Sequence, residues 1–510
     1  MACYLMGIDN GGTLCKAALF DLAGKEIAVA SRKTEMLTPK PDHFERDADR
    51  MWVATAESIR EVIEKSGVNA ADIACVACTG HGNGLYLTDK QGKPVRLAIN
   101  SMDSRARSYI EKWQGQGLEE KVRPRTMQCL WPGQPNALLA WLKDNEPETM
   151  EKAGWVFMCK DFVRFKLTGE IQAELTDMSA TSLMDLRTCK YDQELFDLWG
   201  ISEMISLMPP IVQTAEVCGG VTKECAAQTG LPEGTPVAGG LFDIDACGLA
   251  SGMIDDNQLC MVAGTWGNNQ FASKTPVVDK DVFMTSCYSI PGYYLMLEGS
   301  PTSASNFEWF ASEFFKADMR LPENTGKSVY QLCEELLQST PEDKGLFFLP
   351  FVMGANVNPY AKGTFIGLTA RHGRGDMIRA IFEGVVFSHK WHVQRLMKFT
   401  KMPGCIRLTG GAAKSERWVQ IFADCFQVPV QIPDGSELGA LGAAIAAGVA
   451  VKSFGSYAEA CGKMVRFSRT QSHDESKRAY YEGKFGGYMK ILAALEPVWR
   501  AISGMPNNDF

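Results

Sequence analysis

The chain has 510 residues, of which 45% are hydrophobic and 22% are charged, values that are typical of a folded globular protein. This length is enough for a full hydrophobic core and for about two or three domains. Lys and Arg number 52 against 60 Asp and Glu, a formal net charge of −8, which excludes a general basic surface for nucleic acid or anionic membranes. Any phosphate group must therefore be held by local backbone groups and a metal ion.

The sixteen cysteines are scattered without regular spacing, which favours a reducing compartment over a secreted, disulfide-built protein. The N-terminus, MACYLMGIDNGG, lacks the charged and apolar segments of a signal peptide. The longest stretch of small apolar residues, 438–451, is shorter than the ~20 residues that span a bilayer. The sequence predicts a soluble, cytoplasmic protein.

Strand and helix patterns follow one another in the first hundred residues. Residues 1–35 predict a three-stranded meander with turns at NGG and LAGK. Residues 47–66 predict an amphipathic helix, and residues 73–80 predict a short buried strand that ends in a glycine-rich loop.

A pattern of strands and turns similar to that of residues 1–35 recurs in the middle of the chain. Residues 235–253 predict a strand, a loop with an acidic residue and a helix, and residues 258–273 predict a strand, a Gly-Thr turn and a strand. The two patterns, about 250 residues apart, indicate two similarly built halves with a boundary near residue 250. An α/β sheet is predicted for the second half by alternating strands (345–352, 406–411, 428–433) and helices (376–399, 415–427, 438–450).

Two turns are candidate phosphate-binding elements. In GIDNGGT a strand places Asp9 before Gly11, Gly12 and Thr13; glycines let backbone N–H groups approach an oxyanion, and the acid can hold a metal ion through water. In AGTWGN a second turn carries Thr265. Each turn alone is also compatible with an ordinary hairpin, but two turns from two halves can grip one polyphosphate.

Two strand ends carry further candidates. LTGGAAKS places Gly410, Gly411 and Ala412 before Ser415, a good helix N-cap, and leaves room for a flat base. GGLFDIDAC places Asp243 at the end of a strand, where a carboxylate is a candidate general base. The alternative is that an acidic residue caps the following helix, and Asp245 is the expected cap because it lies closer to the helix body.

Two polar loops are candidates for binding a polyol. CTGHGNG contributes His81, and NSMDSR contributes Asp103 and Arg105. For each of these residues taken alone, an ordinary solvated loop explains the pattern better. No G-x-G-x-x-G follows a predicted strand, and no H-E-x-x-H or G-x-S-x-G occurs, so the sequence lacks the motifs of a Rossmann dehydrogenase, a zinc protease or a serine hydrolase.

In this order the motifs resemble the FGGY carbohydrate kinase family, from about Tyr4 to about Ala450. The C-terminal family signature is met by GTFIGL (363–368) followed by DMIRAIFE (376–383). KDFVRFKLTG (160–169) followed by TDMSATSLMD (176–185) resembles the central hallmark.

The chain departs from the family pattern at two places. Leu138 stands where the family usually has a lysine, and Ser101-Met102 stands where it often has a tryptophan before Asp103. The resemblance implies two ribonuclease-H-like (actin-like) α/β domains with ATP and sugar meeting in the cleft between them. Residues 1–250 are the expected sugar-binding domain with the catalytic aspartate, and residues 251–510 the adenosine-binding domain.

The resemblance also implies roles for individual residues. Asp243 would be the base that takes the proton from the sugar hydroxyl, and Asp243 and Asp9 would hold Mg²⁺. The implied ATP-binding residues are Asp9, Gly11, Gly12, Thr13, Lys16, Gly264, Thr265, Gly410, Gly411 and Ala412. The implied sugar-binding residues are His81, Gly82, Asp103, Arg105 and Asp243.

The stretches GGLFDIDACGLASG, MVAGTWG and EGSPTSASNFEWF most resemble the L-xylulose kinase branch. They imply a ketopentose phosphorylated at O5; ribulose, xylulose and erythritol are the alternatives. Two other classes stay open: a chaperone-like or filament-forming ATPase, and a sugar sensor without turnover. The expected partner is a small sugar, with no nucleic acid and no membrane, and formation of a homodimer is left open.

Overall fold

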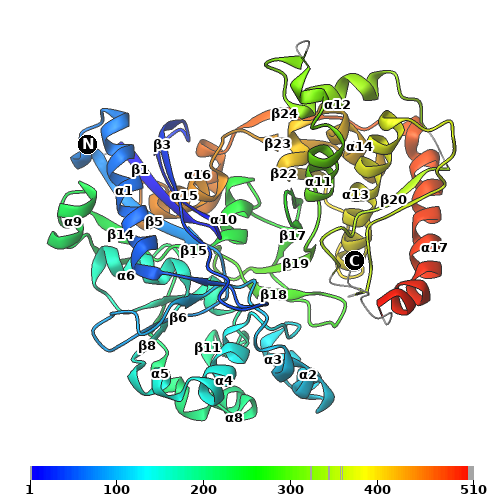
Figure 1. Ribbon diagram of the computed structural model, residues 1–510. Coiled ribbons are helices and arrows are strands. Elements are labelled where there is room, and N and C mark those ends of the chain that lie inside the picture. The colour runs from blue at the N-terminus through cyan, green and yellow to red at the C-terminus, as the bar shows by residue number, and fades with distance from the viewer. Residues whose placement is uncertain (1–2, 322–323, 343–344, 356–357, 359, 504–510) are drawn as a thin grey trace. The chain divides into compact units, whose positions relative to one another are not determined.

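The computed structural model describes residues 3–321, 324–342, 345–355, 358 and 360–503 (Figure 1). The chain folds into two compact units. Unit 1 is Met1–Asp255, Ala272–Met296 and Asp434–Arg466, and unit 2 is Asp256–Phe271, Leu297–Pro433 and Phe467–Phe510. The assignment of sugar binding to residues 1–250 and of adenosine binding to residues 251–510 stays a prediction.

Unit 1 contains one large sheet and several two-stranded pairs. Its strands are β1 (Tyr4–Asn10), β2 (Leu14–Asp21), β3 (Glu26–Lys33), β4 (Glu45–Arg46), β5 (Ile73–Gly80), β6 (Tyr86–Thr88), β7 (Ala98–Ile99), β8 (Trp155–Phe157), β9 (Ala173–Glu174), β10 (Met184–Asp185), β11 (Lys190–Tyr191), β12 (Ile211–Val212), β13 (Val217–Gly220), β14 (Pro236–Ala238), β15 (Leu241–Phe242) and β18 (Met284–Cys287). Its helices are α1 (Ala48–Ser66), α2 (Arg107–Gly115), α3 (Leu118–Thr126), α4 (Pro135–Asn145), α5 (Pro147–Lys152), α6 (Cys159–Thr168), α7 (Leu175–Met178), α8 (Gln193–Trp199), α9 (Lys223–Thr229), α10 (Asp243–Ala250), α15 (Leu438–Ala450) and α16 (Tyr457–Met464).

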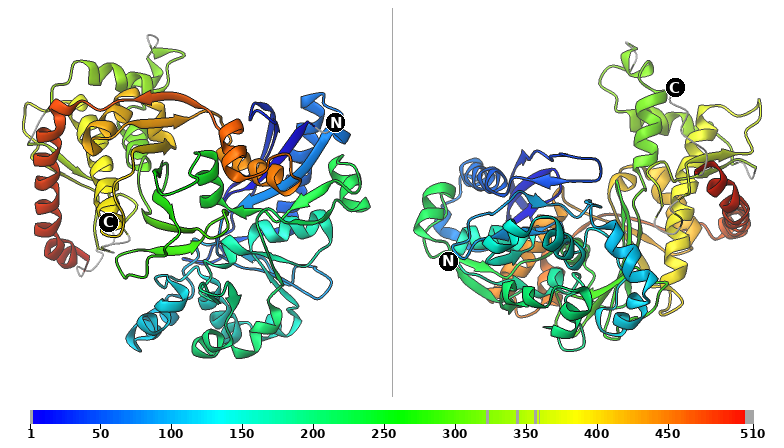
Figure 2. Two further views of the ribbon diagram at one scale, coloured as in Figure 1. Left: turned by 180° about the vertical axis from the view of Figure 1, so that it is seen from behind. Right: turned by 60° about the horizontal axis from the view of Figure 1, so that its bottom comes forward.

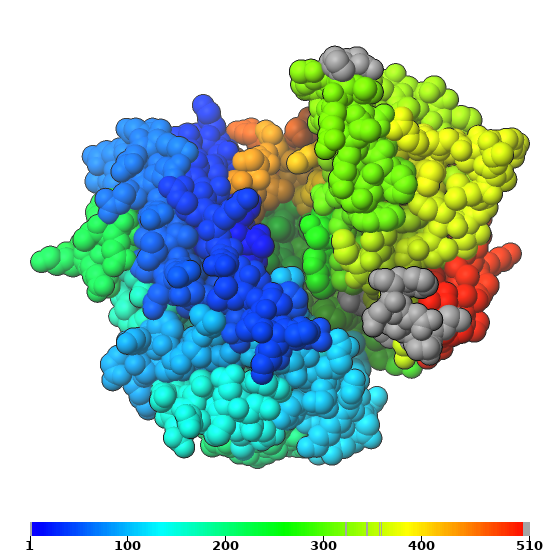
Figure 3. Space-filling model, in the orientation of Figure 1, coloured from blue at the N-terminus to red at the C-terminus, as the bar shows by residue number. Residues whose placement is uncertain are grey.

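The large sheet of unit 1 has the order β13-β14-β5-β1-β2-β3, with β15 also paired to β5. Successive residues of β1 point to opposite faces. Met6 and Ile8 join the apolar core formed with α1 and α6, whereas Gly7 lies against the backbone of Ala440 in α15. Segments far apart in the sequence are therefore neighbours within unit 1: Figure 1 shows the orange α15 beside the blue β1, and Figure 3 shows orange and blue atoms side by side.

Unit 2 contains a second sheet and the longest helices. Its strands are β16 (Gln258–Ala263), most of β17 (Gly267–Ser273) and β19 (Tyr294–Ser300), β20 (Phe347–Leu349), β21 (Thr364–Ile366), β22 (Cys405–Thr409), β23 (Val430–Pro433) and β24 (Phe467–Gln471). Its helices are α11 (Ser305–Phe314), α12 (Val329–Gln338), α13 (Arg374–Leu396), α14 (Glu416–Phe426) and α17 (Arg478–Ser503). Within this unit α17 packs beside α13 and α14 (Figure 2).

The two sheets share one plan. In unit 1 the pair β1–β2 is antiparallel, and β1–β5 and β5–β14 are parallel. In unit 2 the pair β16–β17 is antiparallel, and β16–β22 and β22–β23 are parallel. The predicted likeness of the two patterns, residues 1–35 and 258–273, is thus confirmed as a shared strand order and direction.

The predicted elements are confirmed in type, with shifts at their ends. The helix expected over 438–450 has these bounds, but it packs in unit 1 and not in the second half of the chain, where it was expected. The helix expected over 376–399 is α13. The strand expected over 345–352 is shorter, because only β20 pairs, with β21, in an antiparallel ladder. Among the helices of the described ranges, none combines the length and the apolar character that crossing a membrane requires.

We expect Gly7→Ala to destabilise unit 1. A Cβ atom at residue 7 would lie 1.8 Å from the carbonyl oxygen of Ala440, and overpacking of this kind costs about 1–3 kcal/mol. Urea unfolding should report the loss. Gly115→Ala is the matched control, because a Cβ there meets no atom within 4 Å; an equal effect of both substitutions would contradict the close packing of β1 on α15.

Candidate active site

Two acidic side chains lie at one edge of the unit 1 sheet. β1 and β15 flank β5 and run parallel to it, with Asp9 and Leu241 both in register with Thr79. Asp243 follows β15 directly as the first residue of α10. The carboxyl ends of these parallel strands meet at the same edge, the usual position of ligand sites in α/β sheets.

The carboxylate of Asp9 faces the first turn of α15. A Cβ atom on Gly439 would lie 2.4 Å from Asp9 Oδ2, so glycine leaves the space that this carboxylate occupies. Opposite Asp9 in the β1–β2 ladder is Lys16, whose Nζ lies 2.7 Å from Glu437 Oε2. Lys16, predicted to bind nucleotide, is thus already paired with a carboxylate.

Burial dominates the electrostatics of the two aspartates. It raises the pKa of Asp243 to about 7, and the nearby charge of Asp9 adds to this effect. Burial likewise raises the pKa of Asp9 to about 6; the Lys16 ammonium opposes this rise and Glu437 adds to it. The charge of Asp9 thus disfavours ionisation of Asp243, as expected for two like charges that share a site.

A buried arginine holds the turn that follows Asp9. Arg46, in β4, donates from Nη2 to the carbonyl oxygen of Gly11 at 2.8 Å and also to that of Gly12. Thr13 is exposed at the end of this turn. Sequence reasoning missed Arg46, because nothing in its local pattern shows a partner 34 residues away.

A buried charged network fixes the strand that leads to Asp243. Lys160 lies 3.0 Å from Asp161 and 3.2 Å from Glu174. Glu174 accepts a bond from Thr176 Oγ1 at 2.7 Å, and this hydroxyl accepts the backbone N–H of Phe242 at 2.9 Å. The family motif at 160–169 therefore acts within unit 1 by positioning the residue before Asp243.

The His81 loop packs against the same strand. A Cβ on Gly82 would lie 2.0 Å from the ring of Phe242, so this glycine permits direct contact. His81 Nε2 lies 3.1 Å from Tyr86 Oη, and burial lowers the pKa of His81 to about 3. The imidazole is therefore neutral near pH 7, and its Nδ1 is buried with no protein partner in the described structure.

Asp103 and Arg105 form a buried ion pair. Asp103 accepts from the guanidinium of Arg105 at 2.8 and 2.9 Å and from the backbone N–H of Phe44 at 2.7 Å. Arg105 also contacts Glu45 at 2.7 Å. The alternative of a solvated loop is wrong for these two residues, since both are buried; their predicted contact with sugar stays a prediction.

Unit 2 brings its two predicted nucleotide-binding segments together. Gly410 has φ of 90°, and a Cβ there would lie 2.6 Å from the carbonyl of Ala263 and 2.7 Å from the amide of Gly264. The turn before Thr265 therefore lies directly against Gly410. Ser415 caps α14 by accepting from the N–H of Trp418, which confirms the predicted N-cap. Gly411 and Ala412 lie in the short turn between Gly410 and Ser415.

A buried histidine supports the Thr265 turn. The Ser303 N–H donates to the carbonyl oxygen of Thr265 at 3.1 Å, and Ser303 Oγ lies 2.9 Å from His389 Nε2. His389 Nδ1 lies 2.7 Å from Asn269 Oδ1. Since that amide oxygen is an acceptor, Nδ1 carries the proton and Nε2 accepts from the serine; burial lowers the pKa of His389 to about 3.

Asp245 is not a helix cap, which corrects the expectation from the sequence. The N-cap of α10 is Phe242, which makes no side-chain cap bond. Asp245 lies inside the helix and accepts from the N–H and the hydroxyl of Ser289 at 2.9 and 3.1 Å. Burial raises the pKa of Asp245 well above its ordinary value, and only the fold reveals this partner.

The residues at the sheet edge fit a magnesium ion that is shared with phosphate. Within the ranges that the structure describes, no group of three or more His, Cys, Asp or Glu side chains gathers as a ready-made metal site. Mg²⁺ in phosphoryl-transfer sites needs only one or two carboxylates, together with phosphate oxygens and water. Asp9 and Asp243 meet this requirement, and a cation would offset the repulsion between them.

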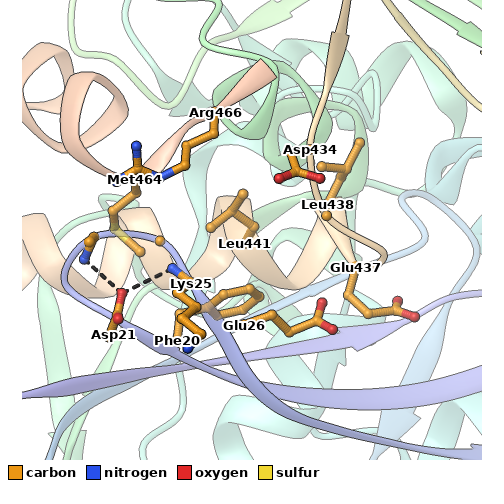
Figure 4. Close-up of a pocket in the computed structure, with 13 residues that line it drawn as sticks. Phe20, Asp21, Lys25, Glu26, Asp434, Glu437, Leu438, Leu441, Met464 and Arg466 are labelled. Atoms are coloured by element: carbon orange, nitrogen blue, oxygen red, sulfur yellow. Dashed lines mark hydrogen bonds between the residues drawn. The ribbon is translucent and has the colours of Figure 1, made fainter. Parts of the chain in front are cut away.

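A pocket of about 440 Å³ lies on unit 1 between the β2–β3 turn and α15 (Figure 4). Its wall includes Lys25, Glu26, Asp434 and Arg466. Glu437, the partner of Lys16, also lines it. Asp9 and Asp243 do not line this pocket, so it is separate from the carboxylate pair.

The sequence of the chain is similar to those of known carbohydrate kinases. Residues 4–249 match the N-terminal domain, and residues 259–451 the C-terminal domain, of the FGGY family of carbohydrate kinases. The chain is 36% identical to the L-xylulose/3-keto-L-gulonate kinase of Escherichia coli, over 97% of this chain and 98% of that protein. It is 34% identical to a protein of Pasteurella multocida named "Probable L-xylulose kinase", over 97% and 99% of the two chains.

A solved structure extends the likeness to three dimensions. The xylulose kinase from Rhodospirillum rubrum superposes with a TM-score of 0.86 at 27% identity, over 98% of this chain and 100% of that one. The fold is thus the two-domain, ribonuclease-H-like α/β fold that the sequence predicts. This chain belongs to the FGGY family and is an ATP-dependent carbohydrate kinase.

Proposed function

We propose that the chain phosphorylates L-xylulose at O5, with ATP as the phosphoryl donor and Mg²⁺ as the metal ion. The choice of L-xylulose as the substrate rests on the similarity to L-xylulose kinases over 97% of the chain. The observation that supports the chemistry is the position of Asp243 and Asp9, both partly buried, at the carboxyl edge of the sheet. Ribulose, xylulose and erythritol are the alternative acceptors.

Asp243 is the proposed general base. A base works best when its pKa lies near the working pH, and burial raises the pKa of Asp243 to about 7. The backbone N–H groups of Asp243 and Ile244 partly offset this rise, because they favour the ionised carboxylate. Asp243 would take the proton from the O5 hydroxyl as that oxygen attacks the γ-phosphorus of ATP.

Alignment and charge stabilisation supply the rest of the catalysis. Negative charge on the transferred phosphoryl group is stabilised by N–H donors and by Mg²⁺ when it is bound. Asp9 and Asp243 would hold the ion, and Gly11, Gly12 and Thr13 would line the phosphates in a turn that Arg46 fixes. His81, Gly82, Asp103 and Arg105 are the proposed sugar-binding residues.

In unit 2 we expect the nucleotide to contact two segments that lie against each other. These are the turn at Gly264 and Thr265, and the strand end at Gly410, Gly411 and Ala412. The cysteines of the described ranges form no disulfide, which supports the cytoplasm, where ATP is available, as the proposed site of action.

Asp243→Asn should bind ATP normally and lower kcat by about two to four orders of magnitude, the usual size of a general-base contribution. ADP release should be measured with L-xylulose, D-xylulose, L-ribulose, 3-keto-L-gulonate and erythritol, and O5 attachment should be read by NMR of the product. Asp42→Asn, at an exposed position of unit 1, is the control. If the Asp243→Asn variant turns over at the native rate, Asp243 is not the general base. If the wild-type enzyme prefers another acceptor, L-xylulose is not its substrate.

The same substitution should stabilise the metal-free protein at pH 8. The pKa of Asp243 is about 7 in the folded chain against an ordinary 3.8, so folding favours the protonated form and stability falls as pH rises from about 4 to about 7. Each pKa unit corresponds to ~1.4 kcal/mol, so we expect a gain of at least ~1 kcal/mol for Asp243→Asn at pH 8 that shrinks at pH 5. Urea unfolding in EDTA measures it; a gain that is the same at both pH values would show that ionisation is not its cause.

His389→Ala should raise the KM for ATP about tenfold, a change of ~1.4 kcal/mol, and leave the KM for sugar nearly unchanged. The substitution removes the acceptor that holds Ser303, which in turn holds the Thr265 turn. His392→Ala is the matched control, because His392 is equally buried on α13 but pairs with Glu298. Equal changes in both KM values would argue against a role of this turn in nucleotide binding.

A further inference from the structure

Two cysteines that are distant in the sequence are in contact in unit 1. The Sγ atoms of Cys189 and Cys287 lie 3.7 Å apart. Cys189 is half-buried in the loop of the β10–β11 hairpin, in a left-handed backbone conformation with φ of 54°. Cys287 is the last residue of β18 and is buried. A disulfide requires the sulfurs to approach to about 2.05 Å, so a small movement separates this pair from a covalent bond.

The two thiols differ in reactivity. The hydrogen bond with Cys287 lowers the pKa of Cys189 to about 7, against the opposing effect of burial. The same bond, together with burial, raises the pKa of Cys287. The thiolate is the form that reacts with oxidants, and access to solvent is the second requirement. Cys189 meets both requirements, while Cys287 lies in position to attack the oxidised product.

We propose that Cys189 and Cys287 form an oxidation site that closes to a disulfide when the protein meets a hydroperoxide. The Cys189 thiolate attacks one peroxide oxygen and breaks the O–O bond, which yields a sulfenic acid and, with hydrogen peroxide, hydroxide. The Cys287 thiol then attacks the sulfenic sulfur, and the S–O bond breaks to release water. Overall, two thiols are oxidised to one disulfide and one hydrogen peroxide is reduced to two waters.

The position of Cys287 links this site to the strand before Asp243. The Cys287 N–H donates to Ser179 Oγ at 2.9 Å, and Ser179 Oγ donates to the carbonyl oxygen of Thr176 at 2.7 Å. Thr176 Oγ1 in turn accepts the N–H of Phe242 at 2.9 Å. Three hydrogen bonds therefore connect the backbone of the buried cysteine to the residue that precedes the proposed base.

A second connection reaches the first turn of α10. Ser289, two residues after Cys287, donates from its N–H and its hydroxyl to Asp245. Asp245 lies two residues after Asp243 in the same helix. Closing the sulfurs from 3.7 Å requires the hairpin loop or the end of β18 to move. A shift of β18 is transmitted to both sides of Asp243.

The oxidation step can be tested without reference to catalysis. The fully reduced chain should be titrated with hydrogen peroxide, alkylated, digested without reductant and analysed by mass spectrometry. We expect a peptide pair linked through Cys189 and Cys287 that disappears on treatment with dithiothreitol. Cys287→Ser should stop at the sulfenic acid, trapped by dimedone on Cys189. No linked pair, or preferential linkage of other cysteines, would overturn the proposal.

The effect on activity rests on the proposed role of Asp243, and its test uses the same samples. Oxidised wild-type protein should lose about a hundredfold in kcat/KM, the cost of a displacement of roughly 1 Å at the reacting centre, and dithiothreitol should restore it. Cys189→Ser should keep its full activity in peroxide, whereas Cys405→Ser, which removes a half-buried thiol of unit 2, should be inactivated like the wild type. A linked but fully active enzyme would overturn the coupling to α10. A reduced wild type without kinase activity would instead refute the proposed function and leave the mass result intact.

Discussion

Desolvation of two neighbouring carboxylates is the constraint on which the site in unit 1 depends. Asp9 lies near the end of β1 and Asp243 directly follows β15, the two strands that flank β5, and burial raises both pKa values toward neutrality. A protein keeps such a pair only when the surroundings are rigid, since each ionised carboxylate would otherwise gain by reaching water. The rigidity has visible sources: Arg46 on the turn after Asp9, and the bonded chain from Lys160 to Phe242 before Asp243.

Unit 2 has the same strand order and directions as unit 1 but different residues at the edge of its sheet. Its sheet edge carries small residues instead of acids, and Gly410 lies against the turn that contains Gly264. Bare backbone at such an edge offers N–H donors and a flat surface. The buried Ser303–His389–Asn269 chain supports the turn from behind. One strand order thus presents two carboxylates at the sheet edge in unit 1 and small residues in unit 2.

The sequence predicted most of the fold, because its strands and helices have strong local patterns. The residues of β5 and α15 were predicted to the residue, and the family motifs identified the kinase class. What it could not predict were contacts between segments far apart in the chain. Arg46 on Gly11, His389 behind the Thr265 turn, and Ser289 on Asp245 all depend on tertiary packing. Asp245 was mistaken for a cap because helix position alone does not show which partner a carboxylate meets.

The packing of α15 has a consequence for the way the protein is made. This helix lies against β1 at Gly7 and against α10 at Ala246, where a Cβ on Gly442 would be 2.1 Å from the carbonyl oxygen. The ribosome therefore delivers the first strand of unit 1 more than four hundred residues before its covering helix. Until then the Gly7 face of β1 lacks its native cover, and such long-range closure slows folding and exposes the nascent chain to aggregation. The order of these segments in the sequence therefore creates a need for chaperones during synthesis.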